Sequence, residues 1–221
     1  YLFDTDTAGK LLCFTDRGNC FTLPVGSIPD VKPSQRGSAP GGLLAGLESG
    51  ENIVGVMELP AKLDGHMLLT TRQGMVKRTE LSQFSVRGAK FAAIKLREGD
   101  FVIGAVIIEP SEEWNATHHI VSVTEGGFGK RVEPSQYEAK GRAIQGVLCH
   151  RLSDKTGKLC SVAAATDDDD IMIITNEGTL IRTPVADIPV YSRTAAGVIV
   201  MRLAEGASIV NTTITPSEKE E

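Results

Sequence analysis

The residues of this sequence that could do chemistry are lysines and arginines at fixed distances from glycines. Five of them lie three or four residues after a glycine of the form T-x-x-G: Lys77, Arg78, Lys130, Arg131 and Arg182. Positive side chains held in a row on one surface bind phosphates, above all the sugar-phosphate backbone of nucleic acids. The charges alone favour solvated turn residues of an ordinary scaffold, although such a row also suits contact with a sugar-phosphate backbone.

No catalytic or metal-binding constellation stands out beside these basic residues. The four cysteines (Cys13, Cys20, Cys149 and Cys160) form no C-x-x-C pair and have no metal-ligand spacing. The aspartates at 167–170 lack the alternating ligand spacing of a calcium loop. We expect no catalytic residue, no metal and no cofactor, and cysteines of this kind favour a reducing cytosol.

A fourfold repeat organises the chain and must position the basic residues. Four apolar runs end in the landmark glycines Gly18, Gly74, Gly127 and Gly178. The second landmark, which we call the middle landmark, is an apolar or aromatic residue ten residues after each glycine. The four middle landmarks are Ile28, Phe84, Tyr137 and Ile188. A third landmark is a leucine at the end of a β-like run, and these leucines are Leu47, Leu96, Leu152 and Leu203.

Each repeat has the pattern of short β-strands. An apolar run, a turn that needs glycine and a second apolar run predict a hairpin. No window shows convincing helical periodicity, so we expect no long helix. Four short strands recurring every ~50 residues are typical of propeller blades, which must pack on one another to bury their faces. We predict an all-β, propeller-like disc, with a solenoid or a pair of β-sandwiches as the alternative.

The repeats define one domain and a tail. They cover residues 8–59, 64–108, 117–165 and 168–214, so the domain extends over residues 1–215 and an acidic tail over 216–221. The first residue is Tyr1 rather than a methionine, and the opening residues YLF resemble the last strand of a preceding copy. We therefore expect a further blade upstream.

A second group of basic residues lies between the middle landmark and the third strand of each repeat. It comprises Lys32, Arg36, Arg87, Lys90, Lys140, Arg142 and Arg193. Equivalent positions in equivalent units should form a band on the outer perimeter of the disc. The net charge of −5 disfavours nucleic-acid binding, but acid is concentrated at 167–170 and in the tail. Two other functions stay open: a protein-interaction propeller and a propeller enzyme with a site at its axis.

Several segments, matched in order, resemble the C-terminal β-pinwheel found in the A subunit of bacterial DNA gyrase and in its paralogue, the A subunit of topoisomerase IV. They are G-M-V-K-R-T-E-L-S-Q-F (74–84), F-G-K-R (128–131), S-Q-Y-E-A-K-G-R-A-I-Q-G-V (135–147), T-N-E-G-T-L-I-R-T (175–183) and S-R-T-A-A-G-V-I-V-M-R-L (192–203). The resemblance runs over about residues 8–212. It implies an all-β, propeller-like β-pinwheel of repeated four-stranded blades.

The resemblance also implies a function. The family's domain binds and wraps duplex DNA without sequence preference and presents it for strand passage, while the cleavage tyrosine and the ATPase site lie on other domains. We therefore expect a cytoplasmic, nucleoid-associated, non-enzymatic domain. Its partners would be double-stranded DNA, the ATPase B subunit of the full enzyme, and the remainder of the A subunit, with no membrane contact. The predicted DNA contacts are Arg36, Lys77, Arg78, Arg87, Lys90, Lys130, Arg131, Lys140, Arg142, Arg182 and Arg193.

One family motif is not reproduced. Gyrase A subunits carry a box like Q-R-R-G-G-K-G in the first blade, and the nearest fragment here is Gln35-Arg36-Gly37-Ser38. Even with the expected upstream blade, the chain is one blade short of the six common in gyrase. Either the box lies in that upstream blade, or the protein relaxes and decatenates DNA as topoisomerase IV does. The sequence leaves the choice between the two paralogues open.

Overall fold

The computed structural model describes residues 4–32, 34–109 and 111–217, and its main elements are four antiparallel β-sheets. Each sheet is built on a hairpin closed by one of the landmark glycines. All four glycines are left-handed, with φ of +81° at Gly18, +79° at Gly74 and +82° at both Gly127 and Gly178. A side chain at such a φ is strained, which is why glycine stands there. The predicted all-β fold of repeated hairpin units is confirmed.

The four sheets have these strand orders. Sheet A contains β3 (Ile53–Glu58), β1 (Lys10–Thr15), β2 (Asn19–Pro24) and β6 (Lys90–Ala92). Sheet B contains β7 (Val102–Ile108), β4 (His66–Thr71), β5 (Met75–Glu80) and β10 (Val147–Leu148). Sheet C contains β11 (Leu159–Thr166), β8 (His118–Thr124), β9 (Phe128–Val132) and β14 (Val198–Ile199). Sheet D contains β15 (Ile209–Pro216), β12 (Asp169–Thr175) and β13 (Leu180–Pro184).

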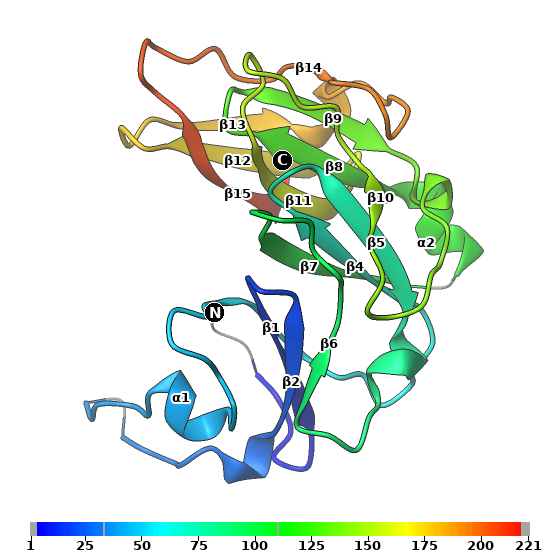
Figure 1. Ribbon diagram of the computed structural model, residues 1–221. Helices are drawn as coiled ribbons and strands as arrows, with labels where there is room; N and C mark the ends of the chain where they lie inside the picture. Colours follow the sequence, from blue (N-terminus) through cyan, green and yellow to red (C-terminus); the bar gives the residue numbers. More distant parts are fainter. Residues whose placement is uncertain (1–3, 33, 110, 218–221) are drawn as a thin grey trace.

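The sheets follow one another in an arc, with sheet A at one end and sheet D at the other (Figure 1). Their innermost strands β3, β7, β11 and β15 are neighbours and surround a central cavity of about 290 Å³. Apolar and small side chains dominate its lining. This is the arrangement of propeller blades around an axis.

The outermost strand of a blade comes from the next repeat. Strand β6 belongs to the second repeat but completes sheet A, and β10 and β14 complete sheets B and C in the same way. The registers are equivalent, with Cys20 opposite Phe91, Val76 opposite Val147 and Gly129 opposite Val198. The sequence pattern predicts four strands of one repeat in one blade, and the outermost strand is where this prediction is wrong. The exchange pairs the otherwise open edge of each hairpin, leaving fewer unpaired backbone groups.

Three landmark glycines also accept backbone hydrogen bonds from the exchanged segments. The carbonyl of Gly74 accepts hydrogen bonds from the backbone N–H groups of Cys149 (2.8 Å) and His150 (3.3 Å). The carbonyls of Gly18 and Gly127 each accept two N–H groups from the next repeat in the same way. A Cβ atom on Gly74 would lie 2.7 Å from the carbonyl oxygen of His150. The glycine is therefore needed for close backbone approach as well as for its φ angle.

The first repeat departs from this plan. Its expected third strand, the run ending at Leu47, begins as the short helix α1 (Pro40–Leu43). Proline at the start of the helix removes no intrahelical hydrogen bond. The following residue, Leu44, is buried in a cluster with Leu11 and Phe21 on the outer face of sheet A. No preceding hairpin among the described residues offers this segment an edge, so it folds over its own blade.

The remaining helical elements are short. Helix α2 (Glu112–Thr117) begins after Ser111, whose hydroxyl accepts the N–H of Trp114 at 3.0 Å. Single 3₁₀ turns precede or include the middle landmarks: η1 (Val25–Ser27), η2 (Leu81–Phe84), η3 (Pro134–Gln136) and η4 (Val185–Asp187). The expectation of no long helix is confirmed for the described residues.

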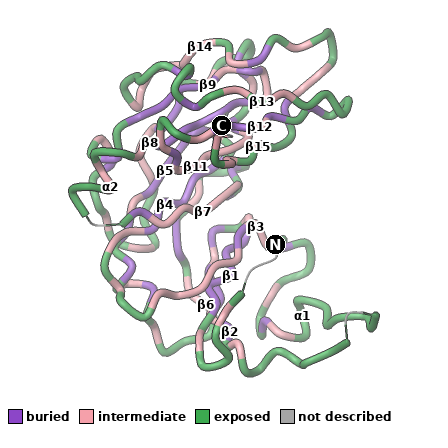
Figure 2. The backbone as a smooth tube through the Cα atoms, turned by 180° about the vertical axis from the view of Figure 1, so that it is seen from behind, coloured by how far each residue is buried: buried purple, intermediate pink, exposed green. Residues whose placement is uncertain are grey.

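Three of the four core clusters lie between adjacent blades, and Figure 2 shows the buried residues concentrated on the strands. One buried cluster joins sheets A and B and contains Phe14, Met67 and Phe84. Equivalent clusters join sheets B and C around Tyr137, and sheets C and D around Ile188. Blades therefore stabilise one another by burying the apolar faces that a lone blade would expose.

Two parts of the domain prediction fall at the ends of the chain. The opening residues 1–3 lie outside the described residues, as do residues 218–221 of the predicted tail. Pro216 ends strand β15. Within the described part of the chain, no helix is long and apolar enough to cross a membrane.

The hairpin glycines give a matched test of the strand exchange. Gly74 and Gly178 have nearly the same φ, but a Cβ atom on Gly178 would have nothing within 4 Å. Both Gly74→Ala and Gly178→Ala should show the left-handed strain of about 1–2 kcal/mol. Gly74→Ala should lose at least about 2 kcal/mol more, because the methyl group meets a backbone carbonyl. Urea unfolding measures both, and equal losses would contradict the exchanged packing.

Candidate nucleic-acid interface

Two of the predicted DNA contacts, Lys77 and Lys130, are inside the protein. Their relative exposures are 1% and 0%. The Lys77 ammonium donates to the carbonyls of Ala93 (2.5 Å) and Gly141 (3.1 Å). Burial lowers the pKa of each lysine to about 8. The prediction of a surface position is wrong for both lysines, because an ammonium enclosed by protein carbonyls cannot reach a phosphate.

Lys130 holds the exchanged segment of the fourth repeat. Its ammonium donates to the carbonyls of Ser192 (2.9 Å), Arg193 (2.7 Å) and Ala195 (2.8 Å). Each of its three N–H groups thus has a backbone acceptor, which compensates for the loss of water. The repeated lysine three residues after the glycine is therefore a structural clamp between repeats.

The arginines at the next position clamp the following repeat through its 3₁₀ turn. Arg78 donates to the carbonyls of Pro134 (3.3 Å) and Tyr137 (3.2 Å) and is half-buried. Arg131 is only 7% exposed; its guanidinium donates to the carbonyls of Ala186 (3.1 Å) and Ile188 and pairs with Asp167. The predicted surface position is wrong for Arg131 as well.

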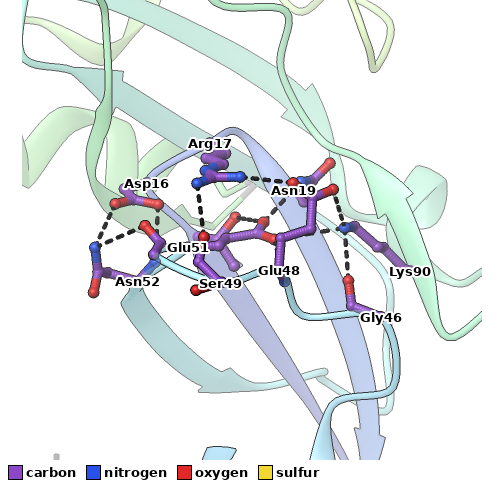
Figure 3. A network of polar contacts seen from close by, with 11 residues as sticks. Asp16, Arg17, Asn19, Gly46, Glu48, Ser49, Glu51, Asn52 and Lys90 are labelled. Atoms are coloured by element: carbon purple, nitrogen blue, oxygen red, sulfur yellow. Dashed lines mark hydrogen bonds and ion pairs between the residues drawn. The ribbon is translucent and has the colours of Figure 1, made fainter. Parts of the chain in front are cut away.

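Lys90 is held in a polar network on the first blade (Figure 3). Its ammonium donates to the Gly46 carbonyl at 2.8 Å and lies 3.4 Å from Glu48 and 3.5 Å from Glu51. Burial raises the pKa of Glu51, but hydrogen bonds from Asn19 and other donors outweigh it and hold the pKa at about 2. Lys90 therefore faces two carboxylates, which neutralise it as a phosphate contact.

Three further predicted contacts are partly engaged. Arg142 lies over the ring of Phe91, with its guanidinium carbon 4.8 Å from the ring centroid. Arg193 donates to the carbonyl of Leu148 at 2.7 Å. Arg182, on β13, donates to Asp170 at 2.7 Å. Each remains partly exposed and keeps positive charge near the outer strands.

The last three predicted contacts are on the surface without side-chain partners. Arg36 and Arg87 are exposed, and Lys140 is half-exposed. Among the described residues, none forms a side-chain hydrogen bond or ion pair with them. Lys140 is fixed through its backbone, because its N–H donates to the Arg78 carbonyl at 2.8 Å.

The structure adds a row that the sequence reasoning missed. Lys95, Arg151 and Arg202 each stand one residue before a third-landmark leucine, so the repeat itself carried the signal. They follow β6, β10 and β14, the outermost strands of sheets A, B and C. All three are exposed, and no side-chain bond to another described residue engages them. We call Lys95, Arg151 and Arg202 the rim row.

The inner strands contrast with this rim. None of β3, β7, β11 and β15 contains a lysine or an arginine. Within the described residues, no three His, Cys, Asp or Glu side chains come together as a metal site. The rim row thus lies beside the outermost strands of sheets A to C, where an extended polyanion can follow it.

His150 is a buried polar link between sheet C and the fourth repeat. Its Nε2 donates to the carbonyl of Ala196 at 2.9 Å, and its Nδ1 lies 3.0 Å from Ser122 Oγ. Burial and then the nearby Lys130 charge lower its pKa to about 4. The imidazole is therefore neutral at pH 7 and fully hydrogen-bonded.

Comparison with known sequences gives one family. The family model described as the DNA gyrase C-terminal domain, beta-propeller, matches residues 9–57, 65–109, 118–165 and 169–216. The DNA gyrase A subunit of Aminobacterium colombiense is 32% identical over 218 residues, covering 96% of this chain and 25% of that protein. The DNA gyrase A subunit of Salmonella typhimurium is 29% identical over 255 residues, covering 95% and 29%. The chain thus spans less than a third of these relatives.

Solved structures agree on the fold. The C-terminal domain of E. coli ParC is similar with a TM-score of 0.70 at 14% identity, covering 96% of this chain and 84% of that one. The C-terminal domain of DNA topoisomerase IV is similar with a TM-score of 0.55 at 20% identity, covering 96% and 80%. At these sequence identities, the similarity shows that the fold is the same.

The buried histidine predicts a pH dependence. Its folded-state pKa of about 4 lies below the ordinary value of 6.5, so between these values the unfolded chain binds the proton and the folded chain does not. Stability from this group is complete above pH 6.5 and should fall by about 3 kcal/mol between pH 7 and pH 4. The measurement compares urea unfolding of the wild type with His150→Gln across this range. Parallel pH profiles would contradict a buried neutral His150.

Proposed function

The chain belongs to the family of DNA gyrase C-terminal domains, and on that premise we propose that it binds double-stranded DNA without sequence preference and wraps it around its rim. The observation that carries the proposal is the rim row. It places one exposed, unpaired cation beside the outer strand of each of three consecutive blades. A duplex that follows this edge meets a cation on each blade.

The chemistry of the rim supports backbone contact rather than base reading. Phosphates are bound by lysine and arginine without regard to sequence, whereas base reading needs side chains that enter a groove. Smooth bending of a 20–30 base-pair duplex costs on the order of 1–6 kcal/mol. Several phosphate contacts along a curved edge offset that cost, and a single cation does not.

The proposed contact set follows from the burial and partners of each basic residue. Seven predicted contacts are left out because carbonyls or carboxylates engage their donors: Lys77, Arg78, Lys90, Lys130, Arg131, Arg182 and Arg193. The set comprises Arg36, Arg87, Lys95, Lys140, Arg142, Arg151 and Arg202. Residues from all four repeats are represented, as a continuous DNA path around the blades requires.

In the whole protein, the domain would deliver its bound duplex to a strand-passage core. We propose that the chain is an accessory domain without catalytic residues of its own, acting in the cytoplasm with the remainder of an A subunit, together with an ATPase B subunit. A protein-interaction propeller remains the rival function, favoured by the net charge of −5. Absence of DNA binding at low salt would decide for that rival.

The rim row gives the first test. Binding to a linear duplex should weaken with salt, because bound cations displace counterions with a slope of about −0.9 per phosphate contact. The triple variant Lys95→Ala, Arg151→Ala, Arg202→Ala should reduce the magnitude of this slope by about 3.

The buried cations provide the control for that experiment. Lys130→Met should lower the free energy of unfolding by about 3 kcal/mol, because three backbone carbonyls lose their donor. It should leave the salt slope unchanged under conditions where the variant is folded. A slope altered by Lys130→Met but not by the triple variant would contradict the assignment of the rim.

DNA topology gives the second test. If the duplex bends around the rim, a nicked circle ligated in the presence of the domain should have a shifted linking number after deproteinisation. The rim-row variant should abolish the shift under the same conditions. Binding without any shift would leave DNA binding but remove wrapping, as expected of a domain that acts in relaxation or decatenation.

A further inference from the structure

The first blade lacks an arginine that the other three blades share. Four residues after the landmark glycine, sheets B, C and D have Arg78, Arg131 and Arg182, whereas sheet A has Thr22. The guanidinium groups donate to backbone carbonyls in sheets B and C and to a carboxylate in sheet D. A threonine side chain is too short to reach as far. The space that a guanidinium occupies in the later blades is therefore not filled in sheet A.

The residue opposite the missing arginine differs as well. In sheet B, Nδ1 of His66 lies 3.1 Å from the guanidinium of Arg78, and in sheet D the carboxylate of Asp170 accepts from Arg182 at 2.7 Å. These partners stand eight residues before their landmark glycines, and the equivalent residue of sheet A is Lys10. A cation thus replaces an acceptor, and it forms no side-chain hydrogen bond or ion pair with another described residue.

A cleft of about 560 Å³ lies where the arginine is missing. Lys10 and Thr22 line it from sheet A, and Ser85 and Arg87 line it from the segment that leads to β6. Thr22 is paired with Leu12, which belongs to the cluster that joins sheets A and B, and the side chains of directly paired residues lie on the same face of a sheet. The cleft therefore lies between two blades of the described chain rather than at either end of it.

The lining of the cleft consists of donors and cations that lack acceptors. The hydroxyl oxygen of Thr22 is buried and has no hydrogen-bond partner among the described residues. The side chains of Ser85 and Arg87 likewise form no hydrogen bond or ion pair within the described chain, and no described Asp or Glu lines this cleft. A buried polar group without a partner is destabilising, and two cations beside one cleft repel each other. An anion with several acceptor oxygens would relieve both costs.

We propose that this cleft binds a phosphate group. Lys10 and Arg87 supply the positive charge, and the hydroxyls of Thr22 and Ser85 donate to the remaining phosphate oxygens. Such charge-assisted hydrogen bonds are stronger than those between neutral groups. The cleft is larger than one phosphate, so the group is either a free hydrated phosphate or a phosphate of a DNA backbone. Only the second source rests on the proposed function.

The cleft is separate from the rim row. Lys95 follows the segment that bonds to the Gly18 carbonyl, at the turn of the hairpin formed by β1 and β2. Lys10 and Pro24 are paired at the opposite, open end of that hairpin. Contact between DNA and the rim row therefore does not by itself place a phosphate in the cleft, and different variants can test the two sites.

Inorganic phosphate tests the cleft without DNA. Isothermal titration calorimetry of the chain should show one site for a free phosphate. Replacing both cations, Lys10→Gln with Arg87→Gln, should raise the dissociation constant at least tenfold. The matched control is Arg97→Gln with Lys158→Gln, because both residues are exposed and neither lines the cleft. The control has the same net charge as the first variant and should change the constant by less than about twofold.

Binding of a linear duplex across a salt series distinguishes the two sources of the phosphate. If the source is the DNA backbone, Lys10→Gln with Arg87→Gln should reduce the magnitude of the salt slope by about 1. Binding of inorganic phosphate with an unchanged duplex slope would assign the cleft to a small phosphate ligand. If the wild type binds no duplex, the proposed function fails and the phosphate titration alone decides about the cleft. No effect of this variant in either experiment, or an equal effect of the control, would overturn the phosphate site.

Restoring the arginine gives an independent test. Lys10→His with Thr22→Arg reproduces the pair formed by His66 and Arg78 in sheet B. The new guanidinium should fill the cleft and donate to carbonyls of η2, as Arg78 does to those of η3 and the following residue. Phosphate binding should then be lost, while the urea midpoint of unfolding should not fall. A folded variant that keeps the phosphate affinity of the wild type would contradict this location of the site.

Discussion

The structure depends on one interaction: in sheets A, B and C, the open backbone edge of the hairpin is paired by a strand that comes from the next repeat. Three sheets are completed in this way, and the landmark glycine of each hairpin receives two N–H groups of the arriving segment. The same connection brings apolar faces of neighbouring blades into contact. Hydrogen bonding and burial thus act on the same residues, so one blade cannot be stabilised without the next.

The repeated lysines and arginines contribute charged hydrogen-bond donors to this connection between repeats. Lys130 donates to three carbonyls of the arriving segment, and Arg78 and Arg131 donate to carbonyls of the next 3₁₀ turn. Hydrogen bonds from charged donors contribute about 1.5–3 kcal/mol each when their partners are in place. A conspicuous Lys-Arg pair is therefore part of the connection between blades. The cations left over for a ligand are those that no carbonyl or carboxylate engages.

The inner strands and the rim of the arc differ in the positive charge that they carry. The inner strands carry no lysine or arginine, while Lys95, Arg151 and Arg202 follow the three exchanged strands. Strand exchange therefore also determines where the rim row lies, because each exchanged segment carries its own cation to the edge of the preceding blade. On the first blade, Glu48 and Glu51 neutralise Lys90. The free rim charge thus lies on the segments contributed by the later repeats.

The sequence by itself determined the all-β fold, the four units and the hairpins, because alternating apolar runs and left-handed glycines depend on neighbours in the chain. It also contained the rim row, since Lys95, Arg151 and Arg202 share one offset from a leucine. Only the tertiary structure decided which blade each third strand completes and which cations are buried. Lys77 and Lys95 both stand at fixed distances from a landmark residue of the second repeat. They differ in exposure because carbonyls of Ala93 and Gly141 enclose the Lys77 ammonium, whereas Lys95 lies in solvent. Burial of that kind is set by contacts between residues far apart in the chain, which local patterns do not specify.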